Sequence, residues 1–324
     1  MSADDPLARV AAGGKAALAR ALAALEARPD AADTVALLDA AWAAPRGQAL
    51  GLTGPPGVGK STLIDALIRA LRAQGRRVAV IAVDPSSRRT RGALLGDRTR
   101  LSTDPDDGDV FVRSMAARDR LGGLSAITFP ALVLMRALYD VVIVETVGVG
   151  QSETEIADVA DTVVFCAQPG SGDALQFMKA GVMEIPHLAV VTKADMGAPA
   201  RRALADLKGA LSLAAGGDPP PAMALSATTG EGVADLAAAI EARIDGLAAS
   251  GALAARRRDQ AAVWARGAVA EAFGAEGVAR IGLGIGAAAQ SGGAKGIPAP
   301  SPFRVVRDAK NRLMRALDVG LSGS

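Results

Sequence analysis

The sequence predicts an α/β protein: a doubly wound, mostly parallel sheet with helical extensions at both ends of the chain. Between about residues 48 and 245, short β-branched or apolar runs alternate with segments of helical periodicity, which is typical of repeated strand–helix units. Some runs, such as the residues 141–144 between Asp140 and Glu145, are apolar at every position and favour central strands buried on both faces. Half of the 324 residues are apolar, enough to bury such a core.

The predicted elements follow in chain order. The first 45 residues have apolar side chains at helical spacing, and Pro29-Asp30 separates two predicted helices. Six runs predict strands: Ala49–Thr53, Val78–Val83, Val110–Val112, Val141–Val144, Thr162–Cys166 and Leu188–Val191. Met223–Leu225 is a candidate for a seventh strand. Beyond about residue 248 the strand pattern stops, and helices are predicted over 250–273 and 303–317, joined by a Gly- and Pro-rich segment.

The composition argues against several classes of protein. One cysteine cannot form an intramolecular disulfide or a multi-thiolate metal site, and one histidine argues against catalysis by histidine clusters. The net charge of +2 gives no basic field, so we expect no nucleic-acid partner. No apolar run approaches the roughly 18 residues of a membrane span, and the N-terminus lacks the pattern of a signal peptide. We expect a cytoplasmic protein with no membrane partner.

The sharpest motif is a complete GxxxxGK[ST] phosphate loop between a predicted strand and a helix over about 60–73. Its glycines let backbone N–H groups surround a phosphate, and the helix N-terminus adds its positive dipole end. The lysine can bridge the β- and γ-phosphates, and the serine hydroxyl can bind Mg²⁺. We expect triphosphate binding by the whole motif: Gly54, Pro55, Pro56, Gly57, Val58, Gly59, Lys60, Ser61 and Thr62.

Three carboxylates are candidates for the metal and the attacking water. Asp84 ends the second predicted strand, where ligands bind in open α/β sheets, and Asp97 lies on the same connection. Glu145 ends the fourth strand and is followed by Gly148, as in the segment of GTPases that senses the γ-phosphate. Val149 stands where Ras-like proteins carry the water-orienting Gln, so we expect slow intrinsic hydrolysis that a partner accelerates.

The sixth strand leads into a T-K-A-D sequence that predicts guanine binding. One carboxylate can accept both guanine donors, which fits Asp195, and the stem of Lys193 can pack against the ring. The loop beginning at Ser226 and Ala227 resembles the one whose backbone N–H binds guanine O6. Thr192 stands where many GTPases carry Asn, and this departure predicts the loss of an amide that ties the base loop to the phosphate loop.

Five motifs together resemble the MeaB/ArgK family of P-loop GTPases, the chaperones associated with methylmalonyl-CoA mutase. They are G-P-P-G-V-G-K-S-T, A-V-D-P-S-S, G-A-L-L-G-D-R-T-R, E-T-V-G-V-G-Q-S-E and Q-P-G-S-G-D-A-L-Q. The resemblance covers roughly residues 49–240. It implies an N-terminal helical extension (1–46), a P-loop GTPase domain (47–247) and a C-terminal helical dimerisation arm (248–324). It also implies that Lys60, Asp84, Asp97 and Glu145 carry the hydrolysis, the last three organising Mg²⁺ and water.

The resemblance further implies a homodimer that binds a coenzyme-B12-dependent acyl-CoA mutase, most directly methylmalonyl-CoA mutase. GTP binding and hydrolysis would gate the delivery of adenosylcobalamin and protect the mutase from inactivation. The residues around Pro169–Gly172 look like an additional switch loop of the family. The residues expected to couple the switch to the partner are Gln151, Asp173, Gln176 and Lys179. No cobalamin-binding His motif is visible, so we expect the partner to hold the cobalamin.

Two other functions share some of these features. A P-loop kinase acting on a small metabolite would have the same phosphate loop, but it would not need the ordered guanine motifs. A nucleotide-switched regulator of amino-acid transport is a second alternative, since the family has carried that name. Comparing GTP with ATP turnover separates the kinase from the GTPase.

Overall fold

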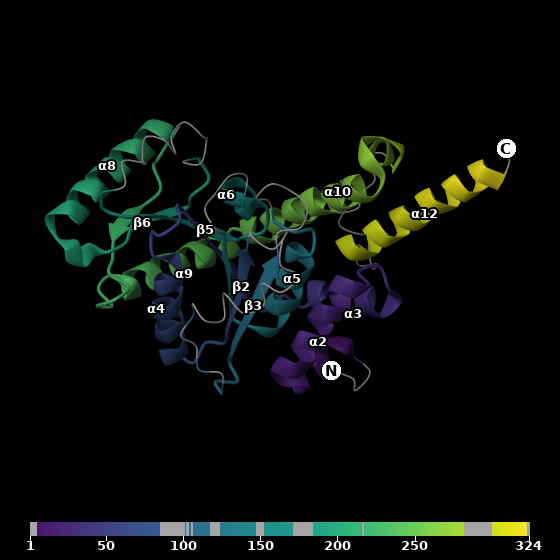
Figure 1. Cartoon of the computed structure of the whole chain (residues 1–324), viewed down its shortest axis with the longest axis horizontal. Coiled ribbons are helices and arrows are strands. Elements are labelled where there is room, and N and C mark those ends of the chain that lie inside the picture. The colour runs from purple at the N-terminus through teal and green to yellow at the C-terminus, as the bar shows by residue number, and fades with distance from the viewer. Residues whose placement is uncertain are drawn as a thin grey trace. The chain divides into compact units, whose positions relative to one another are not determined.

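The computed structural model describes residues 5–84, 101, 104, 106–116, 124–146, 152–170, 184–215, 217–281 and 300–322. Within them, seven parallel strands form one sheet in the order β3-β2-β4-β1-β5-β6-β7 (Figure 1). The strands are β1 (Gln48–Thr53), β2 (Val78–Asp84), β3 (Val110–Ala116), β4 (Val141–Glu145), β5 (Thr162–Ala167), β6 (Leu188–Val191) and β7 (Ala222–Ala224). On one side of β1 the strands β5, β6 and β7 follow in chain order, and on the other side β4 lies between β1 and β2. The predicted doubly wound parallel fold is confirmed.

The central strand β1 lies between β4 and β5, with Leu50 beside Ile143 on one side and Thr162 on the other. Strand β3 is longer than its apolar run, because it pairs with β2 as far as Ala116. An edge strand needs ladder partners on one side only, so polar residues can extend it.

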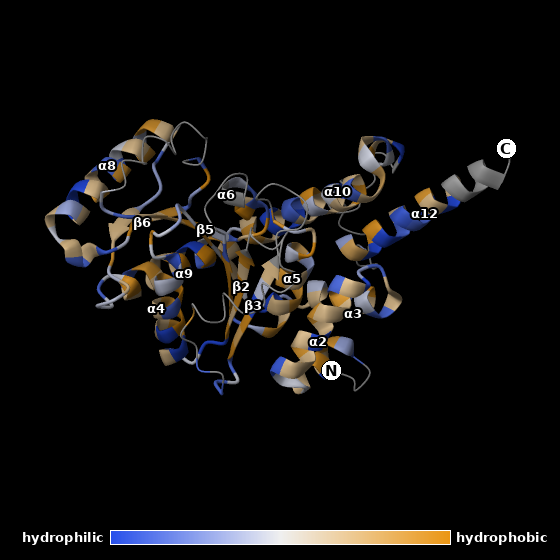
Figure 2. Ribbon diagram, viewed as in Figure 1, coloured by the Kyte–Doolittle hydropathy of each residue, from blue (hydrophilic) through white to orange (hydrophobic). Residues whose placement is uncertain are grey.

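Helices cover both faces of this sheet. One core cluster joins alternate residues of the strands to α4 (Lys60–Ala73) and α9 (Val233–Ala249), which pack side by side (Figure 1). The opposite alternation, with Phe165 and Val191, packs on α8 (Ala198–Ala214). In Figure 2 the strands are largely orange (hydrophobic), whereas the helices carry both orange and blue (hydrophilic) residues. Three short helices complete the connections: α6 (Ser152–Glu155), η1 (Ile156–Asp158) and η3 (Ala194–Met196).

The chain divides into two compact units. One holds the sheet and comprises residues 46–128 and 139–251, and the other comprises residues 1–45, 129–138 and 252–324. The second unit thus joins both ends of the chain to one segment from its middle, α5 (Thr128–Leu138). The predicted domains 1–46, 47–247 and 248–324 follow from the family resemblance, and this division stays a prediction.

The N-terminal segment forms three helices: α1 (Pro6–Ala12), α2 (Gly14–Ala27) and α3 (Ala32–Ala43). The prediction of two helices missed the break before α2, where Gly14 takes a φ of +59° that a continuous helix does not permit. Asp5 caps α1 by accepting the backbone N–H of Leu7 at 3.0 Å, and Pro6 occupies the first turn. The predicted break at Pro29-Asp30 is confirmed.

The C-terminal segment forms α10 (Ala252–Ile281) and α12 (Pro302–Ser322). Helix α10 is interrupted at Gly274, whose φ of 68° and ψ of −173° are not helical, so its first part ends where the predicted helix 250–273 does. The two helices pack through Val269, Val306 and Leu313. Among the described helices, none combines the length and the apolar character needed to cross a bilayer.

Candidate nucleotide-binding site

The phosphate loop lies between the end of β1 and the start of α4, as predicted. Gly54 has a φ of +134°, and a Cβ there would lie 2.2 Å from the carbonyl oxygen of Cys166, so only glycine fits beside β5. Gly59, with a φ of +95°, is the N-cap of α4 and turns the chain into the helix. The loop therefore presents the N-terminal N–H groups of a fourteen-residue helix to a ligand at the carboxyl edge of the sheet.

Lys60 points back along this loop rather than into solvent. Only 6% of its surface is exposed, and its Nζ donates to the carbonyl oxygens of Gly54 at 2.7 Å and Pro55 at 3.0 Å. A buried ammonium is stable only with such partners. These two neutral carbonyl oxygens hold the ammonium beside the expected phosphate site. Anionic phosphate oxygens would bind the ammonium more strongly and could replace the carbonyls as its partners.

Two oxygen ligands suited to Mg²⁺ lie together beside the loop. The Ser61 hydroxyl donates to Oε1 of Glu145 at 3.0 Å, so the first turn of α4 and the end of β4 meet here. Asp84 ends the neighbouring strand β2, two residues beyond Ala82, which pairs with Glu145. Mg²⁺ prefers one or two protein oxygens together with phosphate and water, and this pair fits that donor set. The described residues contain no group of three or more His, Cys, Asp or Glu side chains that could hold a metal ion by themselves.

A buried pair of threonines fixes the chain just after Glu145. Thr146 donates its backbone N–H to the carbonyl of Leu52 at 3.2 Å, and its hydroxyl donates to the hydroxyl of Thr53 at 3.2 Å. Both threonines are fully buried. The contact joins the residue that follows β4 to the last residue of β1, directly before the phosphate loop. Sequence reasoning missed this pair, although the two threonines end neighbouring strands.

The two segments predicted to bind guanine lie side by side. The backbone N–H of Ala194 donates to the carbonyl of Leu225 at 2.9 Å, which joins the T-K-A-D turn to the loop that begins at Ser226. Asp195 lies in the short helix η3 with its side chain exposed, as a ligand-binding carboxylate must be. Ser226 is fully buried, and its Oγ accepts the backbone N–H of Thr229 at 3.2 Å, which shapes the loop around Ala227.

Thr192 corrects one expectation. The loss of Asn at this position was expected to remove the tie between the base loop and the phosphate loop. The structure keeps the tie, because the Thr192 hydroxyl donates to the carbonyl of Val58 at 2.7 Å, with the carbonyl of Ala167 also within 3.0 Å. Thr192 is 2% exposed, so water does not compete for this contact. A hydroxyl donor thus replaces the amide donor.

Lys193 links three parts of the site. It has a left-handed backbone with a φ of 58°, which is uncommon for a residue other than glycine and indicates that the turn is held by its surroundings. Its Nζ donates to Oε1 of Gln168 at 2.5 Å and lies 3.4 Å from the carbonyl of Gly57. The base loop therefore contacts both the phosphate loop and the residue that follows β5.

Several predicted residues lie outside the described parts of the chain. They are Asp97, Gly148, Gln151, Asp173, Gln176 and Lys179. The position of Asp84 is described but not its side chain. The structure therefore brings together the phosphate loop, Glu145 and the base loops, and the roles assigned to the residues outside it stay predictions.

Comparison with known proteins agrees with this geometry. The sequence profile described as "Methylmalonyl Co-A mutase-associated GTPase MeaB" matches residues 18–280. A Caulobacter vibrioides protein named "Putative GTPase" is 42% identical over 264 residues, which cover 79% of this chain and 81% of that protein. The mouse "Methylmalonic aciduria type A homolog, mitochondrial" is 41% identical over 221 residues, or 66% of this chain and 53% of that protein.

A solved structure supports the same assignment. The crystal structure described as "LAO/AO transport system kinase" has a TM-score of 0.64 and 29% identity, covering 95% of this chain and 96% of its own. The likeness extends over nearly the whole chain, beyond the phosphate loop. The chain belongs to the MeaB family of methylmalonyl-CoA mutase-associated GTPases and is a GTPase.

Proposed function

We propose that this GTPase is a chaperone of a coenzyme-B12-dependent acyl-CoA mutase, with methylmalonyl-CoA mutase as the first candidate. The family match over residues 18–280 carries this proposal, and the name of the mouse relative supports it. Cycles of GTP binding and hydrolysis would gate delivery of adenosylcobalamin to the mutase and protect it from inactivation. This chain itself would bind no cobalamin.

In the proposed hydrolysis, water attacks the γ-phosphorus, the bond to the β–γ bridging oxygen breaks, and GDP and phosphate leave. Lys60 would exchange its carbonyl partners for β- and γ-phosphate oxygens as charge develops on them. Ser61 and Glu145, with Asp84 and Asp97, would hold Mg²⁺ and its water ligands. Gly148 would sense the γ-phosphate through its backbone N–H.

Guanine selectivity would depend on Asp195, whose exposed carboxylate can accept both N1–H and the 2-amino group. Replacing Asp195 with Asn exchanges one acceptor for a donor, so the Asp195→Asn variant should prefer xanthine over guanine nucleotides. Calorimetric titration with GDP, XDP and ADP measures this preference. Equal affinity of the parent protein for ADP and GDP would contradict the guanine assignment.

The coupling to the partner would run through Gln151, Asp173, Gln176 and Lys179. The test is GTP turnover of the chain alone and with purified methylmalonyl-CoA mutase. We expect the mutase to raise turnover, Lys60→Ala to abolish it in both conditions, and Lys179→Ala to keep the basal rate but lose most of the stimulation. A parent protein that the mutase does not stimulate would weigh against the chaperone role and leave the GTPase assignment intact.

The proposed dimer would form through residues 248–324. Sedimentation of the full chain tests this, and a monomer at micromolar concentration would count against it.

The name of the structural relative, a transport system kinase, favours one second candidate, a P-loop kinase acting on a small metabolite. Such a kinase would transfer the γ-phosphate to that metabolite instead of water. Incubation with γ-labelled GTP and cell extract distinguishes the two, since a GTPase releases the label as inorganic phosphate.

A further inference from the structure

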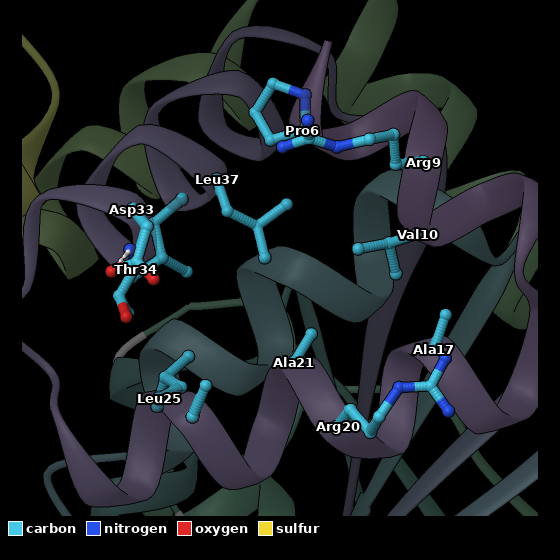
Figure 3. A pocket seen from close by; sticks show the side chains of 12 residues that line it. Pro6, Arg9, Val10, Ala17, Arg20, Ala21, Leu25, Asp33, Thr34 and Leu37 are labelled. Carbon is cyan, nitrogen blue, oxygen red and sulfur yellow. Dashed lines mark hydrogen bonds between the residues drawn. The ribbon is translucent and has the colours of Figure 1, made fainter. Parts of the chain in front are cut away.

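An open pocket of about 330 Å³ lies among the three N-terminal helices α1, α2 and α3 (Figure 3). Its lining is largely apolar, with Val10, Leu25 and Leu37 among the residues, and the arginines beside it, Arg9 and Arg20, are exposed. An apolar hollow of this kind does not select one ligand. A more selective polar contact lies within the other compact unit, between the end of β5 and the base loop.

The sheet register places Gln168 beside the base loop. Gln168 directly follows β5, whose last residue, Ala167, pairs with Val191 at the end of β6. The backbone N–H of Thr192 donates to the carbonyl of Ala167 at 2.8 Å and extends this pairing by one step. Gln168 therefore lies next to the turn that carries the T-K-A-D sequence.

Two features direct the Gln168 side chain toward the phosphate loop. Pro169 follows it, which disfavours a helical backbone for Gln168 and favours continuation of the strand. Side chains alternate along an extended chain, so Gln168 takes the same face as Cys166, which packs in the core cluster that contains α4. Its Oε1 accepts from Nζ of Lys193 at 2.5 Å, and the same ammonium lies 3.4 Å from the carbonyl oxygen of Gly57.

The two oxygens restrict a side chain that has many rotamers. Lys193 is exposed, and a lysine without such contacts keeps rotamer entropy that a ligand packed against its stem must remove. The contact with Gly57 is long for a hydrogen bond, so the Gln168 amide is the closer partner. Both oxygens are neutral, and no carboxylate of the described residues lies at ion-pair distance from Lys193. The amide therefore positions the ammonium and leaves its charge uncompensated.

We propose that Gln168 is a positioning residue for the nucleotide base. It holds the Lys193 ammonium beside the phosphate loop, so the stem lies ready to pack against guanine before the nucleotide binds. Lys193 is then ordered in the free protein, and binding does not have to order it. The inference rests on the proposed role of Lys193 and Asp195 in guanine binding. It adds a residue from the end of a different strand, which acts through Lys193.

Calorimetric titration with GDP tests the inference in a double-mutant cycle. Gln168→Met keeps the length of the side chain and removes the acceptor, and it should weaken GDP binding about three- to ten-fold. Lys193→Met keeps the stem and removes the ammonium. In that background, Gln168→Met should weaken GDP binding by less than about two-fold, because the group through which Gln168 acts is already absent.

Two further variants complete the comparison. Gln168→Glu keeps an acceptor of the same length and should bind GDP within about three-fold of the parent. Gln74→Met makes the same change at the exposed C-cap of α4 and, as the matched control, should bind GDP as the parent does. Thermal unfolding of each variant identifies any loss of folding. Gln168→Ala also lacks the acceptor and takes the place of Gln168→Met if the methionine variant does not fold.

Three results would overturn the inference and leave guanine binding intact. They are parental GDP affinity in Gln168→Met, additive losses from Gln168→Met and Lys193→Met, and a loss in Gln168→Glu as large as that in Gln168→Met. Equal affinity of the parent protein for ADP and GDP would instead contradict the guanine assignment, and the inference with it.

Discussion

Thr192→Val tests the tie between the base loop and the phosphate loop. Valine keeps the branched shape of threonine and removes the hydroxyl that donates to the carbonyl of Val58 at 2.7 Å. The contact is buried, since Thr192 is 2% exposed, and water cannot replace the lost donor without opening the loop. The change therefore removes one buried hydrogen bond and leaves the packing almost unaltered.

The expected magnitude follows from this geometry. A buried hydrogen bond contributes about 0.5–1.5 kcal/mol net, and a carbonyl left without that donor costs about 1–3 kcal/mol. We expect the free energy of unfolding to fall by about 1–2 kcal/mol. Because Lys193 directly follows Thr192 and Asp195 lies three residues after it, we also expect GDP to bind about three- to ten-fold more weakly. Each factor of ten corresponds to about 1.4 kcal/mol.

Urea unfolding and titration with a fluorescent GDP analogue measure the two effects. Thr192→Ser keeps the hydroxyl and is the matched control, and Thr192→Asn restores the amide donor that many GTPases carry. Both should bind GDP more tightly than Thr192→Val does. If Thr192→Val retains the stability and GDP affinity of the parent, or if Thr192→Ser loses as much, the hydroxyl is not the tie.

Three further changes test other parts of the structure. Gly54→Ala places a Cβ 2.2 Å from a carbonyl oxygen, so thermal unfolding should show that the free energy of unfolding falls by about 3 kcal/mol or more. Gly57→Ala is the control, because its Cβ meets nothing within 4 Å, and its free energy of unfolding should fall by only about 1 kcal/mol. Burial raises the pKa of the Cys166 thiol from 9.0 to about 12, so the native chain keeps a proton that the unfolded chain loses. Above pH 9, urea unfolding should show stability falling by up to about 1.4 kcal/mol per pH unit relative to Cys166→Ala, and identical pH profiles would contradict the burial argument. Thr34→Val removes an unpaired buried hydroxyl, so thermal unfolding of the ligand-free protein should be unchanged or higher by about 1 kcal/mol, and a loss above 1 kcal/mol would reveal a partner for that hydroxyl.

The strands and the phosphate loop could be predicted because local patterns determine them. Runs such as 141–144 are apolar at every position, and the loop sequence permits few backbone paths other than the one between a strand and a helix. The fine contacts could not be predicted in the same way. The hydrogen bond between Thr146 and Thr53 depends on the pairing of β1 with β4, which joins residues 93 positions apart.

The composition of the two units shows a further limit of sequence reasoning, and α5 explains it. Every residue of α5 except Ala137 is buried, a pattern that predicts surroundings on all sides but does not identify them. The partners lie far along the chain, because the ring of Phe129 stacks on Trp264 at 5.4 Å and lies 6.2 Å from Phe303 and 6.4 Å from Trp42. Both tryptophans of the chain thus gather on one helix from the middle of the sequence. Domain boundaries placed at single positions along the sequence cannot define such a unit, since its core is assembled from three separate segments of the chain.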